Sequence, residues 1–185
     1  MRIVAIGYVC WTALYLIIKQ LPFDKWLGSK MKPRDKADDL DLRNRLVSFI
    51  HGLALFFLSG YHYMVIPSEC GQFNSIFQRR MMCFTLSYFC YDFVAMYFEN
   101  LLDKTMTIHH SLCMLLIFVA LYENLGGNIA LSTFFAAEIS NPSMHTKHML
   151  RIIGLRYTKA YEFAELSFLI IYIYGRMYLG NRICF

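Results

Sequence analysis

The sequence predicts an all-α fold, a polytopic membrane bundle of about six transmembrane helices. Of its 185 residues, 57% are hydrophobic and 17% are charged, whereas soluble domains are about 45–50% apolar and about 25% charged. The mean hydropathy is +0.40. The apolar residues form six long, continuous runs, and continuous runs exclude a β-barrel, whose strands alternate polar and apolar residues. In a soluble all-α protein, helices this apolar would have to be buried on every side.

The first apolar run, residues 3–18, lies between Arg2 and Lys19. A secretory signal peptide is the alternative reading, but no small-x-small cleavage site follows the run. We therefore expect a short spanning helix that stays attached. Residues 19–45 are polar and mainly basic, and we expect this connector to lie along the membrane surface with Phe23 and Trp26 in the interface.

The other five runs are long enough to cross a hydrocarbon core of about 30 Å at about 1.5 Å per residue. Short connectors separate them, so we divide the chain into residues 1–44, a first transmembrane helix with a basic surface connector, and residues 45–185, a helical bundle. The five runs are residues 46–66, 81–98, 107–122, 129–148 and 161–179.

Basic residues are concentrated in the connectors that follow the first, third and fifth runs. The positive-inside rule then places these connectors inside and both termini outside. The formal net charge of +5 suits a protein beside anionic headgroups. Because the basic residues form no continuous face, we predict no nucleic-acid partner. The six cysteines form no C-x-x-C pair, and we expect free thiols without disulfides.

Ionisable and polar side chains interrupt five of the apolar runs. Charged groups inside a membrane are costly and usually face the bundle interior or a wet cavity, so we expect one shared polar cavity. The residues that we expect to line it are Arg45, Ser48, His51, Tyr88, Asp92, His109, His110, Glu138, Ser140 and Arg176.

Two adjacent histidines, His109 and His110, open the fourth run. Neighbouring helical residues point about 100° apart, so we expect one ring to face the cavity and the other to pack or to meet the interface. Imidazole suits general-base or acyl-accepting chemistry near neutral pH, and Asp92 or Glu138 could orient the inward ring. The alternative is that both are interfacial side chains held by hydrogen bonds.

Pro142 lies inside the fifth run and cannot donate a hydrogen bond to the carbonyl of Glu138. We therefore predict a kink or break in this helix. His145 and His148 have a spacing found among metal ligands, and His51 or Glu138 could complete a set. No H-E-x-x-H motif is present, however, and we predict no metal and no resident cofactor.

The order of these motifs resembles the TRAM–LAG–CLN, or TLC, domain over about residues 40–180. The motifs are R-x-x-S-x-x-H ending at His51, "SYFCYD" ending at Asp92, the histidine pair, E-x-S-x-P ending at Pro142, and the late Arg176. The small proteins that consist of a TLC domain alone are the similar branch. The resemblance implies a helical bundle around a lipid-accessible cavity.

In the ceramide synthases of that family, a pair of histidines and an Asp-x-x-Asp-Asp cluster serve the N-acylation of sphingoid bases by acyl-CoA. The resemblance makes acyl-CoA a candidate co-substrate and assigns catalytic roles to His109, His110, Asp92 and Glu138. It assigns Arg45, Ser48, His51, Tyr88, Ser140 and Arg176 to the cavity. This sequence reads "AAEISNPSMHTKH" where the aspartate cluster would lie.

Two functions follow as expectations. The first is a protein that binds membrane lipid or maintains lipid composition, as an acyltransferase-like enzyme or as a carrier. The alternative is a non-catalytic bundle that serves as a structural subunit of a larger membrane complex, with other membrane subunits as partners. We expect an endomembrane location, first the endoplasmic reticulum, with a mitochondrial membrane as the alternative.

Overall fold

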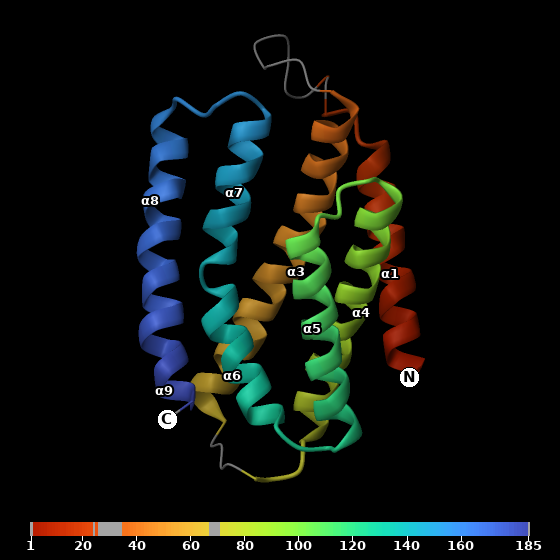
Figure 1. Cartoon of the computed structure of the whole chain (residues 1–185), viewed down its shortest axis with the longest axis vertical. Helices are drawn as coiled ribbons and strands as arrows, with labels where there is room; N and C mark the ends of the chain where they lie inside the picture. Colours follow the sequence, from red (N-terminus) through yellow and green to blue (C-terminus); the bar gives the residue numbers. More distant parts are fainter. Residues whose placement is uncertain (1, 24, 26–34, 67–70, 185) are drawn as a thin grey trace.

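The protein is a bundle of helices with no strand among its described residues (Figure 1). The computed structural model describes residues 2–23, 25, 35–66 and 71–184. The helices are α1 (Arg2–Gln20), α3 (Lys36–Val65), α4 (Ile76–Phe98), α5 (Lys104–Tyr122), α6 (Gly127–Glu138), α7 (Asn141–Ile152), α8 (Lys159–Ile173), the π-helix η1 (Tyr174–Leu179) and α9 (Gly180–Cys184).

Four helices, α1, α3, α4 and α5, are each long and apolar enough to cross a membrane. Two further columns are composite: α6 continues into α7, and α8 continues through η1 into α9 (Figure 1). Each composite column is about 39 Å long at 1.5 Å per residue, enough to cross a core of about 30 Å. The expected all-α membrane bundle is thus confirmed, and α1 begins at the same end of the bundle at which α9 ends (Figure 1).

Three helices begin earlier than the apolar runs predict, because polar capping residues start them. Asp35 caps α3 by accepting from the Asp38 amide at 2.7 Å. Ser75 and Gln78 form a reciprocal capping box at the start of α4. Asp103 accepts from the Met106 amide at 2.7 Å and so caps α5.

The prediction of one surface connector over residues 19–45 is wrong for residues 36–45, which form the first turns of α3. Arg43, in those turns, donates to the carbonyls of Ile18 and Lys19, at 2.7 and 2.9 Å, and so satisfies two of the last carbonyls of α1. Its guanidinium also lies 4.8 Å from the centre of the Phe23 ring. Phe23 therefore packs against the bundle, while Trp26 lies outside the described residues.

The first helix is an integral part of this bundle. Gly7 of α1 sits directly against Ser87 of α4, and a Cβ at Gly7 would clash with the Ser87 hydroxyl. Small residues at such a contact let two membrane helices approach closely. Trp11 and Tyr15 are buried in a core cluster with Tyr91 and other residues of α3 and α4.

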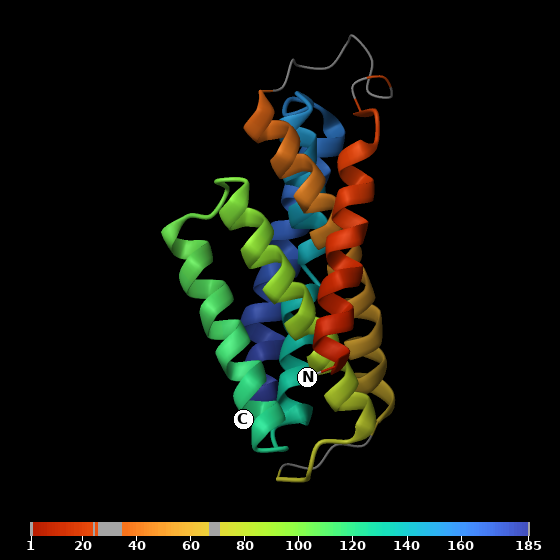
Figure 2. The ribbon, with the colours of Figure 1, turned by 90° about the vertical axis from the view of Figure 1, so that its right-hand side faces the viewer.

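Helix α5 stands apart from the last two columns. It packs along α4 and has a smaller contact with α6, and it makes no comparable interface with α7 or α8 in the described part of the chain. Figure 2 shows α5 inclined away from the column of α8. Of the α5 side chains, His110 and Ile117 are buried and most others are exposed, and we call the exposed surface around His109 the open side of α5.

Candidate functional site

A buried histidine–aspartate pair joins α4 to α5. The Nε2 atom of His110 lies 2.7 Å from Oδ2 of Asp92, and the two residues are 4% exposed. The Nδ1 atom of His110 lies 2.9 Å from the carbonyl of Met106, one turn earlier in α5. Since a carbonyl can only accept, Nδ1 carries a proton and donates it.

That tautomer determines what His110 can do. With Nδ1 protonated, a single proton must lie between Nε2 and the Asp92 carboxylate, whichever of the two atoms holds it. Both ring nitrogens of His110 are then engaged. His110 has no free nitrogen to act as a base or an acyl acceptor unless this pair separates.

Two further side chains close the cluster around Asp92. Asn44 of α3 donates to Oδ1 of Asp92 at 2.7 Å, and the Tyr91 hydroxyl donates to Oδ1 of Asn44 at 2.9 Å. Both Asp92 oxygens therefore have partners, which is what a buried carboxylate requires. We call Asn44, Tyr91, Asp92 and His110 the Asp92 cluster.

His51, Ser48 and Tyr88 form a second group beside this cluster. The Tyr88 hydroxyl donates to Oγ of Ser48 at 2.9 Å. The ring of His51 stacks on that of Tyr88 with centroids 3.8 Å apart. His51 is 2% exposed, and its Nε2 has no hydrogen-bond partner in the described part of the structure.

The predicted break at Pro142 is confirmed, because α6 ends at Glu138 and α7 begins at Asn141. Asn141 donates to Oε2 of Glu138 at 2.7 Å, so the carboxylate bridges the break. The same oxygen points at α3, where a Cβ on Gly52 would lie 2.9 Å from it. Glu138 is 8% exposed.

A second irregularity faces this break. The π-helix η1 packs on α6 through Gly175, where an added Cβ would lie 2.6 Å from the carbonyl oxygen of Ala136. π-Helical turns occur frequently at functional sites. Irregular backbone at membrane depth is tolerated only where protein or a wet cavity covers it. The two irregular segments cover one another here.

Arg176 of η1 lies beside this contact. It is exposed, yet it is close enough to interact electrostatically with Glu138 of α6 and His109 of α5. Its guanidinium also lies 5.7 Å from the centre of the Tyr172 ring. It forms no ion pair with a described carboxylate.

His109 is exposed on the open side of α5, and its ring meets that of His110 edge-on, with centroids 5.6 Å apart. The Sγ atom of Cys113 lies 3.9 Å from each of the two ring nitrogens of His109, a long contact with a weak hydrogen-bonding partner. Phe89 meets the ring edge-on, with centroids 6.2 Å apart. His109 is thus the histidine of the pair whose nitrogens remain available.

The remaining expected site residues have local partners. Arg45 pairs with Asp41, one turn earlier in α3, at 2.9 Å. Ser140 is 1% exposed, and its hydroxyl reaches the carbonyl of Ala137 at 3.4 Å. No three His, Cys, Asp or Glu side chains converge as metal ligands in the part of the chain that the structure describes.

The structure therefore arranges eight of the ten expected residues in three groups, while Arg45 and Ser140 stay with their local partners. The groups are the closed Asp92 cluster, the Ser48–Tyr88–His51 stack, and the more open set of His109, Glu138 and Arg176. A single cavity that all of them line stays a prediction. The sequence reading missed Asn44 because it assigned residues 19–45 to a connector. Extending the helical face of Ser48 back by one turn reaches Asn44.

Comparison with known proteins identifies the family of the chain. The TLC domain family (TRAM_LAG1_CLN8) matches residues 41–185 of the 185-residue chain. The match begins in the first turns of α3 and includes all the groups described above. No solved structure matches the chain. The protein is a membrane protein that belongs to the TLC-domain family.

Proposed function

We propose that this protein binds a membrane lipid by its headgroup at the junction of α5, α6 and η1. We call His109, Glu138 and Arg176 the headgroup site. The observation that carries the proposal is the position of Arg176. It is exposed on η1, about 12 Å from the end of its column, and forms no ion pair with a described carboxylate.

A charge inside the hydrocarbon is stabilised by a partner. Its cost rises toward the bilayer centre, where an arginine costs about 2.5–3.5 kcal/mol even on the lenient insertion scale. A lipid phosphate would remove that cost, because the planar guanidinium binds phosphate in a bidentate manner. Glu138, on the other side of the same space, would accept from a headgroup amine or hydroxyl. The open side of α5 would admit such a lipid laterally, with its tails remaining in the bilayer.

The acyltransferase-like form of the proposal assigns the base to His109. A lipid amine or hydroxyl held by Glu138 would attack the acyl-CoA thioester carbonyl while a ring nitrogen of His109 takes its proton. The C–S bond then breaks, CoA leaves as the thiol after receiving that proton, and the acyl group stays on the lipid nitrogen or oxygen. Arg176 would stabilise the negative charge that develops on the carbonyl oxygen. His110 would hold α5 against α4 through its hydrogen bond with Asp92.

Lipid binding is tested by the Arg176→Gln protein. We expect its co-purified phospholipid, quantified by mass spectrometry, to fall about tenfold, since a charged hydrogen bond contributes about 1.5–3 kcal/mol. The matched control is Arg182→Gln, which removes the same charge from the same column. Arg182 is exposed and reaches only the Tyr178 hydroxyl, at 3.3 Å. Equal lipid content in the two variants would refute the headgroup site.

Acyl transfer is tested separately with His109→Ala. If the protein transfers acyl groups, we expect this variant to keep its helix content and to lose release of free CoA thiol in a coupled assay. His62→Ala is the histidine control. His62 is buried near the C-terminal end of α3, and its Nε2 atom lies 3.0 Å from Nε2 of Gln78. If the wild-type protein releases no thiol with any lipid acceptor, the acyltransferase proposal is refuted. The lipid-binding proposal would still stand.

The alternative is a structural subunit of a membrane complex. It draws on the Asp92 cluster, whose polar atoms satisfy one another as a non-catalytic bundle requires. This alternative expects unchanged lipid in Arg176→Gln and co-purification of the chain with other subunits in mild detergent. For either function we propose an endomembrane, first the endoplasmic reticulum.

A further inference from the structure

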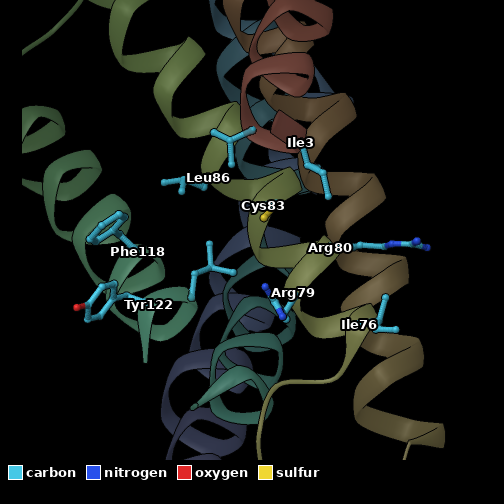
Figure 3. Close-up of a pocket in the computed structure, with 10 residues that line it drawn as sticks. Ile3, Ile76, Arg79, Arg80, Cys83, Leu86, Phe118 and Tyr122 are labelled. Carbon is cyan, nitrogen blue, oxygen red and sulfur yellow. The ribbon is translucent and has the colours of Figure 1, made fainter. Parts of the chain in front are cut away.

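A groove on a different face of the bundle carries a separate proposal. It lies where the beginnings of α1 and α4 meet the end of α5, and its volume is about 610 Å³, within the range of about 300–1,000 Å³ typical of ligand pockets. Its lining is largely apolar, apart from two arginines and a thiol (Figure 3). The lining residues are Ile3, Val4, Ile76, Arg79, Arg80, Cys83, Leu86, Phe118, Leu121 and Tyr122.

The two arginines have no counter-charge within the described residues. Arg79 and Arg80 are both exposed, and neither forms an ion pair or a side-chain hydrogen bond with a described residue. Both lie in the first turns of α4, so they fall near the level at which a bilayer presents its headgroups. Figure 3 shows Arg79 directed toward the lower part of the groove, while Arg80 extends away from Tyr122.

The apolar lining extends from the arginines toward the middle of the membrane. Leu86 lies about two turns further along α4 than Arg79, and Phe118 of α5 faces the same groove (Figure 3). A surface that combines unpaired cations at headgroup level with an adjoining apolar trough complements an amphipathic anion. Zwitterionic headgroups cancel much of that attraction through their own cation.

We propose that this groove is a binding site for an anionic phospholipid, with its phosphate at Arg79 and Arg80 and one acyl chain along Leu86 and Phe118. The site lies near the end of α5, about nine residues from His109, and shares no residue with the headgroup site. It therefore goes beyond the proposed function and does not depend on it. A resident lipid there would join the start of α1 to α4 and α5.

The test uses purified protein and an equimolar mixture of phosphatidylglycerol and phosphatidylcholine, with bound lipid read by native mass spectrometry. We expect wild type to prefer phosphatidylglycerol, and Arg79→Gln/Arg80→Gln to lose that preference about tenfold. Arg79→Lys/Arg80→Lys should keep part of it. Arg156→Gln is the matched charge control, because Arg156 is exposed on the connector at the opposite end of the bundle.

Three results would overturn the proposal: no preference in wild type, an unchanged preference in the double glutamine variant, or an equal loss in Arg156→Gln. Arg176→Gln should leave this preference intact, which separates the two lipid sites. Should the glutamine variant not fold, alkylation of Cys83 gives a second readout in a protein whose other cysteines are replaced by serine. Phosphatidylglycerol should slow that alkylation and phosphatidylcholine should not, and equal rates would contradict the site.

Discussion

Replacing Asp92 with alanine should lower the free energy of unfolding by about 3–5 kcal/mol, the cost of removing one partner from a buried ion pair. The change leaves Nε2 of His110 and the amide of Asn44 without their acceptor in a buried position. Thermal or denaturant unfolding in detergent, followed by circular dichroism, measures the loss. We expect Asp92→Asn to lose less, because the amide keeps one acceptor oxygen.

Asp103→Ala is the control for this prediction. Asp103 is an exposed aspartate that caps α5, and its replacement should cost about 1 kcal/mol. The double variant Asp92→Ala/His110→Ala should be no less stable than Asp92→Ala alone, because no unpaired imidazole remains. Full additivity of the two single losses would show that the pair contributes nothing as a pair.

Gly175→Val should have the second large effect. Its Cβ would meet the Ala136 carbonyl oxygen at 2.6 Å and the Ile139 side chain at 2.9 Å, and the polar backbone atom cannot rotate away. Overpacking of this kind costs about 1–3 kcal/mol. The valine would also move η1 away from the helix break. We therefore expect the variant to lose bound phospholipid as well as stability.

Gly180→Ala provides the matched comparison in the same column. A Cβ at Gly180 would lie 3.6 Å from the carbonyl oxygen of Gly175, an ordinary contact. We expect this protein to unfold within about 0.5 kcal/mol of wild type and to keep its lipid. A Gly175→Val protein with wild-type stability and lipid content would show that η1 need not press on α6.

The helices themselves were predictable from the sequence, because continuous apolar runs leave few alternatives in a membrane. The break before Pro142 was also predictable, since proline lacks the donor that a continuous helix needs. The starts of α3 and α4 were not found from hydropathy. Their first turns are polar, and the signals there are caps, Asp35 for α3 and the Ser75–Gln78 box for α4.

Which of the two histidines contacts Asp92 could not be predicted from the sequence. Helical geometry requires His109 and His110 to point about 100° apart, but only packing shows that His110 meets Asp92. The role of Arg176 depends on a π-helix, and no local pattern in "YGRMYL" indicated one. The sequence analysis did not use the glycines, although Gly52 and Gly175 mark two places where α6 and its break lie close against another helix.

Photocrosslinking locates the lipid headgroup that we propose between α5, α6 and η1. A phospholipid with a diazirine in its headgroup is incorporated into nanodiscs with the protein, and crosslinked residues are located by mass spectrometry. We predict crosslinks on α5 around His109 and on η1 around Arg176, which disappear in Arg176→Gln and persist in Arg182→Gln. Crosslinks confined to the ends of the helices, with none near His109 or Arg176, would contradict the account.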